Sequence, residues 1–358
     1  MILDADSFHK FERWLRWAAY VSGGLLSLAV LLACVGLVYE QIAEIQDRRR
    51  NHPPGQLVDV GGYNMHLYCT GQGSPPVVLD SGMGDTWLVW LKTQPQIDRF
   101  TYVCSYDRAG LGWSDPSPQP RNSIVMAQEL HALVHKAGIP GPYVLAGHSL
   151  GGYNVRMFAS LYPKDVLGVV LVDSAHPAEF KRFVVDNAHK LNMIENTIPF
   201  GLPRLMGWCG SFPPDSRSMA RAVGCQVGPF REAREESAHY REDGEQVRTA
   251  APLGSKPLVV VSRDPETLGM TGLPTNVERD FNKNHEAMQE ELTSLSSDSY
   301  RIIAKGSGHY VQVERPDVVV EAVRDVVDQC KGQTGPQRRI PLRIAQQNPP
   351  LLPTGSPN

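Results

Sequence analysis

Cysteine is scarce in this 358-residue chain, and its six copies show neither a CxxC pair nor the Cys/His spacing of a zinc site. We therefore expect no metal centre. Cys34, Cys69 and Cys104 are expected to be plain core residues with no chemical role. Cys209 and Cys225 share one irregular region that contains Gly and Pro, where they either form a disulfide or stay reduced. A disulfide there would indicate an oxidising compartment.

Clustered positive charge is equally scarce. The formal net charge is −3, and no long basic stripe with interleaved aromatic residues occurs. Proteins that bind nucleic acid usually carry such a stripe, so we expect no nucleic-acid partner. The one sharp basic run is Arg48-Arg49-Arg50, which is typical of the charged flank of a membrane segment.

Charge is absent from residues 17–39, which read WAAYVSGGLLSLAVLLACVGLVY. As a helix these residues would be about 34 Å long, which is enough to cross a hydrocarbon core of about 30 Å. Trp17 and Tyr39 stand at the ends, as interfacial anchors do. We expect an uncleaved, single-pass anchor that contacts the lipid bilayer and follows a short flank (1–16).

Three other interpretations of this apolar segment compete. A cleaved signal peptide usually has a shorter apolar region and a small-residue cleavage site, which is not clear here. A lipoprotein signal would end at Cys34, but apolar residues continue beyond it. A buried core helix would have to include Gly23-Gly24 and have no polar face. Three basic residues lie on each side of the segment, so charge leaves its orientation undecided. A Cys209–Cys225 disulfide would favour a location outside the cytoplasm for the residues that follow the segment.

Beyond a linker (40–55), short β-rich runs alternate with helical stretches such as 123–137 and 152–162. Several of the runs are continuously β-branched, as in strands that are buried on both faces of a parallel sheet. This pattern predicts an α/β fold with a mostly parallel, twisted sheet flanked by helices. Strands are expected at 58–69 (a hairpin turning at Gly61-Gly62), 76–80, 101–107, 143–149, 166–173, 257–264 and 300–306.

Two segments depart from this alternation. Residues 174–256 contain helix-like segments and Pro-rich breaks but no clear strand, so we expect a helical cap inserted between two late strands. The α/β core then consists of residues 56–173 and 257–331. Residues 332–358 are rich in Pro, Gly and Gln and are expected to form a disordered tail.

The pentapeptide Gly147-His148-Ser149-Leu150-Gly151 matches G-x-S-x-G, directly after an expected strand and directly before an expected helix. A sharp strand-to-helix turn lifts the serine hydroxyl out of the sheet, and the two glycines leave room for the close backbone approach. The turn also places the Leu150 amide at the helix N-terminus, where it can stabilise an oxyanion. We predict that Ser149 is the nucleophile of an acyl transfer.

A serine hydroxyl needs a general base, and His309 is the histidine best placed to act as one. It follows the last expected strand in the loop GSGHYVQVERP, which is Gly-rich and could reach back over the sheet. His148 adjoins the nucleophile, so its side chain is expected to point away and to be structural. His176 is a weaker alternative for the base.

The acid that orients the base has two candidates. Asp264 ends the strand PLVVVSRD and lies between the serine and the histidine in chain order. Asp173 ends the preceding strand VLVD, and a carboxylate at either strand end could meet the histidine. We place Asp264 first and Asp173 second. Asp80 and Asp107 also end strands, but they precede the nucleophile and fit the expected order poorly.

An acyl-transfer site also needs a second backbone donor for the oxyanion. The loop after PVVLD reads Ser81-Gly82-Met83-Gly84 and is small and flexible enough to turn an amide inward. We predict that the Met83 amide acts beside that of Leu150. An ordinary Gly-rich loop is the alternative.

Four elements together resemble the capped α/β-hydrolases of the lipase, esterase and peptidase group. They are SGMG (81–84), YDRAGLGWS (106–114), GHSLGG (147–152) and GSGHYVQVERP (306–316). The resemblance covers about residues 56–330 and implies the α/β-hydrolase fold.

The same resemblance separates structural from catalytic residues. In that family the segment like YDRAGLGWSD shapes the loop under the active site, so Asp107 and Arg108 receive no catalytic role. Many members have His-Gly where this chain has Ser81-Gly82. The amide donor is kept, but any role of that histidine in shaping the loop is lost. Epoxide hydrolases and haloalkane dehalogenases have an aspartate nucleophile where this chain has Ser149, which disfavours both activities.

These residues predict a serine hydrolase that cleaves carboxylic esters or related acyl bonds through an acyl-enzyme intermediate. The chemistry requires no metal or organic cofactor. A small, apolar ester is expected as the substrate, because aromatic residues of the cap could line a pocket, although they could equally form the cap's own core. They are Phe180, Phe183, Trp208, Phe212 and Phe230.

Two other functions remain open at this point. A prolyl-type aminopeptidase would need a carboxylate cluster in the cap to bind the substrate amine. Glu232, Glu235 and Glu236 are candidates, but a solvated helix face explains them equally. A non-catalytic binding or scaffold protein on the same fold would need neither Ser149 nor His309.

Overall fold

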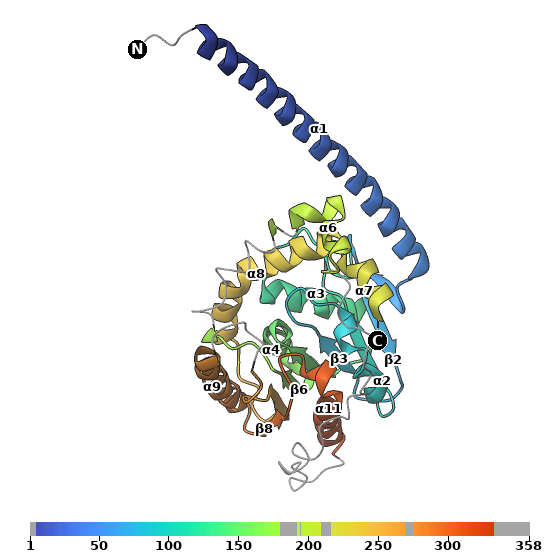
Figure 1. Cartoon of the computed structure of the whole chain (residues 1–358). Coiled ribbons are helices and arrows are strands. Elements are labelled where there is room, and N and C mark those ends of the chain that lie inside the picture. The colour runs from blue at the N-terminus through green and yellow to red at the C-terminus, as the bar shows by residue number, and fades with distance from the viewer. Residues whose placement is uncertain (1–4, 180–191, 194, 209–215, 269–274, 333–358) are drawn as a thin grey trace, which may run out of the picture.

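The computed structural model describes residues 5–179, 192, 193, 195–208, 216–268 and 275–332. An eight-stranded sheet forms its centre, in the order β1-β2-β4-β3-β5-β6-β7-β8 (Figure 1). The first two strands run antiparallel to their neighbours, and β3 to β8 are mutually parallel. The strands are β1 Gln56–Asp59, β2 Asn64–Thr70, β3 Val77–Asp80, β4 Val103–Tyr106, β5 Tyr143–His148, β6 Val166–Val172, β7 Leu258–Arg263 and β8 Ser299–Ala304.

The expected strands and the hairpin turn are confirmed. Every residue of β3, β4, β5 and β7 is buried, which explains their continuous apolar runs. In the hairpin, the Val60 amide donates to the carbonyl of Tyr63 across Gly61-Gly62. The predicted α/β fold, with a mostly parallel sheet flanked by helices, is therefore correct.

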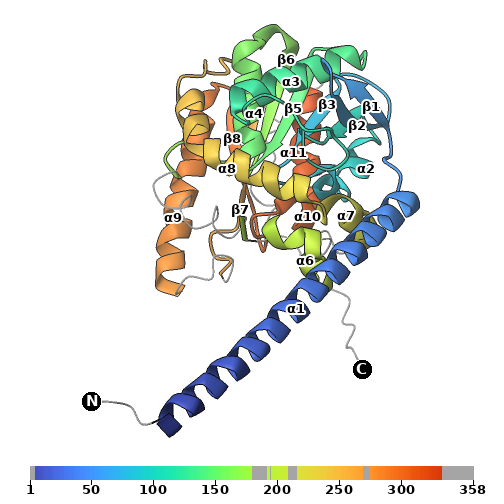
Figure 2. The same cartoon turned by 90° about the horizontal axis from the view of Figure 1, so that it is seen from above.

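Helices cover both faces of the sheet (Figure 2). On one face lie α3 (Ser123–Lys136) and α4 (Leu150–Leu161), whose apolar side chains pack with Leu145 of β5. On the other face lies α11 (Pro316–Cys330), which packs with Val144 of the same strand. Shorter or more peripheral elements are η1 Trp87–Trp90, α2 Gln94–Ile97, η2 Pro163–Asp165, α9 Thr275–Glu291, η6 Leu292–Leu295 and α10 Val311–Glu314.

The segment between β6 and β7 is helical in its described part, as predicted for a cap. It contains η4 (Ile198–Phe200), α6 (Leu202–Leu205), α7 (Arg217–Gly224) and α8 (Val227–Arg248). The longest of these, α8, lies across the end of the sheet that carries the loops after β3 and β4 (Figure 1). Its position brings cap side chains to the loops that border Ser149.

The N-terminal segment forms one long helix, α1 (Ala5–Arg50), which contains residues 17–39 and projects from the body (Figures 1 and 2). Among the described residues it is the one helix long and apolar enough to cross a membrane, and its most apolar window is 0% buried. The linker expected at 40–55 is instead helical as far as Arg50. Its helical form is explained by contacts with the cap, because Glu40 and Asp47 both bind Arg204.

The cysteines differ from expectation. Cys69 of β2 and Cys104 of β4, expected to be plain core residues, stand opposite each other in the strand pairing and form a disulfide. Cys34 lies exposed on α1 rather than in a core. Cys225 is disulfide-bonded, but Cys209 lies outside the described residues, so the pairing of these two stays a prediction. The expected disordered tail also lies outside them from residue 333 onward.

Candidate active site

The turn between β5 and α4 holds Ser149 in the conformation that the G-x-S-x-G pattern predicts. Its backbone has φ 51° and ψ −119°, in a region that residues with a side chain rarely occupy. Close packing fixes the turn, because a side-chain carbon at Gly151 would lie 2.5 Å from the carbonyl oxygen of Asp80, and one at Gly147 would collide with Gly151. Such local strain is typical of functional turns.

Asp173 lies beside Ser149 at the next strand end. His148 and Val172 are paired between β5 and β6, so the residues that follow them emerge side by side at the carboxyl edge of the sheet. Asp173 is the other non-glycine residue with positive φ (40°) in the described part of the chain, and its side chain is fully buried. Two strained neighbours at one sheet edge indicate a functional site.

His309 joins this pair from the loop after β8. Its Nδ1 lies 2.6 Å from Asp173 Oδ2. A carboxylate can only accept, so Nδ1 carries the proton and Nε2 presents a lone pair. The imidazole is 38% exposed, which leaves Nε2 accessible to a reacting group. A histidine held in this tautomer can act as a general base.

Asp264, the first choice for the acid, does not contact His309. Its carboxylate accepts from the amides of Gly306 (2.9 Å) and Glu266 (3.1 Å) and from Lys305 Nζ (3.1 Å). Burial opposes ionisation, but these donors outweigh it and lower the pKa of Asp264. The residue thus fixes the start of the loop that carries His309, and the structure pairs the histidine with Asp173 instead.

Asp173 is surrounded by donors from two further side chains. The Arg263 amide donates to Oδ1 and its Nη1 to Oδ2, each over 3.0 Å, and His285 Nε2 lies 2.9 Å from Oδ1. Burial alone would raise the pKa of Asp173. The nearby charges of His285 and Arg263, together with the hydrogen bonds, instead hold it well below its usual range. The carboxylate is therefore ionised at neutral pH.

His285 is a residue of the site that sequence reasoning missed. It lies on α9, and its Nδ1 is 2.6 Å from Glu179 Oε1, so each ring nitrogen faces a carboxylate. Burial disfavours the charged imidazole, but Asp173 and Glu179 outweigh that effect and raise its pKa to about 9. The surrounding sequence KNHEAM has no feature that could have identified it.

The loop of Met83 is tied to its surroundings by buried Arg108. The guanidinium donates to the carbonyls of Ser81 (2.7 Å) and Gly82 (2.6 Å) and binds Asp80 (2.9 Å). This geometry agrees with the structural role expected for the YDRAGLGWSD segment. The arginine holds the loop beside β5, where Leu150 begins α4 with an amide that has no partner within the helix.

A cap residue completes this network. Glu236 of α8 binds Arg108 Nε (2.6 Å) and accepts from the Gly84 amide (2.8 Å). Gly84 has φ +69°, and a side-chain carbon there would lie 2.8 Å from Ala233 Cβ, so only glycine allows the cap helix to approach so closely. The loop of Met83 and the cap are therefore joined by a buried arginine between two carboxylates.

Ser81 of the loop and His148 of β5 are both held by hydrogen bonds. Where many family members have histidine, the hydroxyl of Ser81 donates to the Thr86 carbonyl and accepts from Trp90 Nε1, both over 3.1 Å. His148 is buried, as expected for a structural residue, and its Nε2 donates to the carbonyl of His309 over 3.0 Å. Burial, followed by the charge of His309, lowers the pKa of His148 to about 3.

The remaining candidates lie outside the pair formed by His309 and Asp173. His176 Nε2 lies 3.6 Å from Glu291, so it has a different carboxylate partner. The glutamates of α8 do not form a free carboxylate cluster, because Glu232 is paired with Arg121 and Glu236 with Arg108. Both are buried, which overturns the solvated-face interpretation for them. Neither is available to bind a substrate amine.

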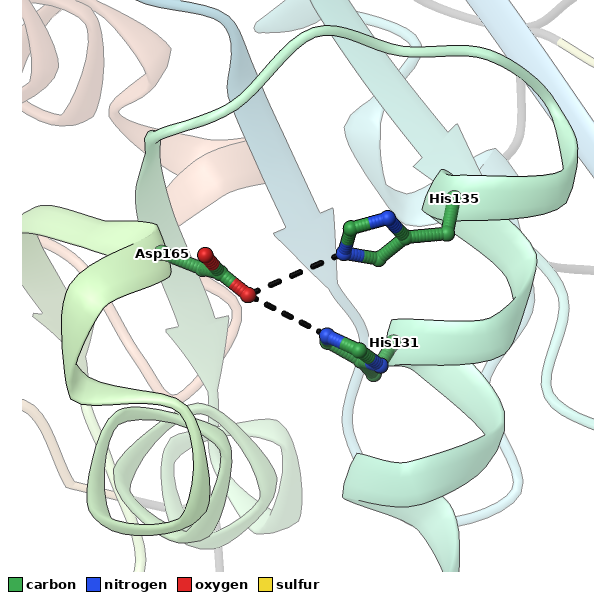
Figure 3. A group of neighbouring side chains, drawn as sticks. All are labelled: His131, His135 and Asp165. Atoms are coloured by element: carbon green, nitrogen blue, oxygen red, sulfur yellow. Dashed lines mark hydrogen bonds and ion pairs between the residues drawn. The ribbon is translucent and has the colours of Figure 1, made fainter.

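Among the described residues, one group could hold a metal ion (Figure 3). His131 and His135 stand one turn apart on α3, and their Nε2 atoms lie 3.1 and 3.7 Å from Asp165 Oδ2. Asp165 directly precedes β6, whereas Asp173 directly follows it. The group therefore lies at the opposite end of β6 from the candidate active site. Its three residues take no part in the chemistry of that site.

Comparisons with known proteins identify the family to which the chain belongs. A model described as "Alpha/beta hydrolase family" matches residues 77–322, which is more than half of the chain. The chain belongs to the α/β hydrolase family. The resemblance inferred from the four motifs is thus confirmed.

Individual relatives are distant. An uncharacterized protein, YqjL, of Bacillus subtilis is 26% identical over 72% of this chain and 85% of its own length. A thermophilic esterase from Thermogutta terrifontis superposes with a TM-score of 0.58 at 21% identity, over 77% of this chain and 98% of that one. The epoxide hydrolase CorEH gives 0.57 at 18% identity, over 76% and 97%. Curated relatives vary in size, and this chain spans only 20% of the length of the first of them.

The His285 charge is expected to affect stability with a defined pH dependence. Its folded pKa of about 9 lies above its ordinary value of 6.5, so its contribution is complete below pH 6.5 and is lost as pH rises through 9. We expect His285→Gln to lower the free energy of unfolding by about 3 kcal/mol at pH 6, and by much less at pH 10. Urea unfolding of both proteins between pH 6 and pH 10 measures this difference in the free energy of unfolding.

The matched control is His239→Gln, which removes a half-buried histidine of α8 that bonds a backbone carbonyl. It should change the unfolding free energy by less than about 0.5 kcal/mol at every pH. A pH-independent loss for His285→Gln would show that the imidazole is neutral in the folded protein.

Proposed function

We propose that this member of the α/β hydrolase family is a serine hydrolase that cleaves carboxylic esters or related acyl bonds. Ser149 is the nucleophile, His309 the general base and Asp173 the acid. The proposal depends on the contact between His309 Nδ1 and Asp173 Oδ2. This contact joins two residues that are 136 positions apart and fixes the tautomer that a general base requires. Asp173 replaces Asp264 as the acid and keeps the chain order serine, aspartate, histidine.

The reaction follows from these positions. His309 Nε2 takes the hydroxyl proton as Ser149 Oγ attacks the carbonyl carbon, and the charge of Asp173 stabilises the imidazolium that forms. The amides of Leu150 and Met83 donate to the oxyanion. The imidazolium then protonates the leaving alcohol, and an acyl-enzyme remains. Water, deprotonated by the same imidazole, releases the acid and restores the serine.

The contacts of the cap glutamates support an ester as the substrate. An aminopeptidase needs a free carboxylate for the substrate amine, and both buried glutamates of α8 already have an arginine partner. Of the aromatic residues expected to line an apolar pocket, Trp208 is exposed and Phe230 is half-buried. Phe180, Phe183 and Phe212 lie outside the described residues.

The proposed enzyme is tethered to a membrane by residues 17–39 of α1, with its catalytic domain outside the cytoplasm. The most apolar part of the uncharged stretch has no buried residue, and the stretch is long enough to span a bilayer. The Cys69–Cys104 disulfide supports the orientation, since such bonds persist in oxidising compartments.

Active-site labelling tests the nucleophile. A fluorophosphonate probe should label the detergent-solubilised full chain, and Ser149→Ala should abolish labelling because the probe reacts with an activated serine. Ser160→Ala, on the last turn of α4, is the matched control and should label normally. Equal labelling of Ser149→Ala and the wild type would contradict the proposal.

A pair of isosteric substitutions tests the acid. Asp173→Asn should lower kcat for p-nitrophenyl acetate by about 10³- to 10⁴-fold, because the amide no longer favours the correct tautomer or stabilises the imidazolium. Asp264→Asn, at the next strand end, should lose less than about tenfold, because its carboxylate bonds the loop and not the imidazole. Circular dichroism checks that both variants fold. The reverse order of losses would restore Asp264 as the acid.

A further inference from the structure

The described part of the cap carries a cluster of exposed apolar side chains beside α1. Among the described residues outside α1, ten large apolar residues are exposed, and half of them fall within residues 200–208. Such a concentration usually marks a surface that is covered by a partner or a membrane. We call it the cap patch; it comprises Phe200, Leu202, Leu205, Met206 and Trp208, which are 41–68% exposed.

The backbone next to the cap patch packs directly on the last turn of the proposed membrane segment. A side chain at Gly36 would collide with the carbonyl of Phe200, so the helix and η4 touch at that point. On the cap side, Gly201 has φ +71°, and a side-chain carbon there would lie 2.6 Å from the ring of Tyr39. Glycine on both partners therefore allows this close approach.

A buried ion pair fixes the same contact. Arg204, within the cap patch segment, donates to both oxygens of Glu40, the first charged residue after the apolar run, at 2.8–3.1 Å. It also binds Asp47, two turns further along α1. These side chains are almost fully buried, so the cap does not shift along the helix without breaking a desolvated charge pair.

These contacts determine how deep the cap patch would lie in a bilayer that α1 spans. Gly36 lies three residues before the end of the uncharged run at Tyr39, which corresponds to about 4.5 Å along the helix. If the run spans the hydrocarbon core, Phe200 lies at the boundary between hydrocarbon and headgroups. Apolar and aromatic side chains at that depth are typical of proteins that insert into the interface.

We propose that the cap patch inserts into the membrane interface and forms a second bilayer contact beside the anchor. The proposal rests on the membrane anchoring proposed above. Lipid is the expected partner because the cap patch continues the apolar surface of α1, at the position along the helix where that surface becomes charged. Glu236 of α8 joins the same cap to the loop bordering Ser149.

Fluorescence quenching in vesicles tests the proposal with the full chain. Cys34 and Cys330 are the free cysteines among the described residues. Three proteins therefore each keep one cysteine outside the Cys69–Cys104 disulfide and the predicted Cys209–Cys225 pair, and this cysteine is labelled with the dye NBD. One keeps native Cys34 and has Cys330→Ala; the other two combine Cys34→Ala and Cys330→Ala with Leu205→Cys or Leu161→Cys. Leu161, the last residue of α4 and 40% exposed, is the control leucine outside the cap patch. The vesicles contain phosphatidylcholine with or without a lipid that carries a nitroxide on its acyl chain.

The three labels separate the failure of this inference from the failure of the anchor. We expect nitroxide lipid to quench the Leu205→Cys label to an extent similar to the Cys34 label, and to leave the Leu161→Cys label unquenched. Quenching of Cys34 with none at Leu205→Cys would overturn the inference while leaving the anchor intact. Absence of quenching at Cys34 would overturn both. Equal quenching at Leu161→Cys and Leu205→Cys would overturn the specific insertion of the cap patch.

Discussion

The short contact between His309 and Asp173 depends on a carboxylate that is buried and still ionised. Arg263 and His285 provide the compensating charge, so Asp173 can direct one imidazole tautomer without becoming protonated. Residues on β7 and α9 therefore help to keep the partner of His309 in its ionised form. The strained backbone of Ser149 and Asp173 places the reacting groups at adjacent strand ends.

A second buried charge, Arg108, connects the site to the cap. It binds Asp80 at the end of β3 and Glu236 on α8, and it holds the carbonyls of the loop that carries the Met83 amide. Removal of either carboxylate would leave a buried arginine partly unpaired, so the position of the cap and the shape of the Met83 loop are coupled. The cap is also bound to α1 through Arg204 and Glu40. Contacts thus run from α1 through the cap to the loop beside Ser149.

The fold and the Ser149 turn were predictable from sequence because their signals are local. Continuous apolar runs identified the strands, and G-x-S-x-G between a strand and a helix identified the turn. The choice of acid was not predictable, because Asp173 and Asp264 end adjacent strands and differ only in their three-dimensional partners. His285 and the Cys69–Cys104 disulfide arise from contacts between distant segments, which no local pattern reports. Glu236 resembled a solvated residue because its partner Arg108 is 128 positions away.

The most direct test of this account is the Nδ1 proton of His309, observed by NMR in protein labelled with ¹⁵N-histidine. A short bond to an ionised carboxylate shifts that proton far downfield, and its loss in His309→Gln identifies the signal. The account predicts that the signal disappears in Asp173→Asn and persists in Asp264→Asn. A signal that survives Asp173→Asn and disappears in Asp264→Asn would contradict the assignment of the acid and the mechanism built on it.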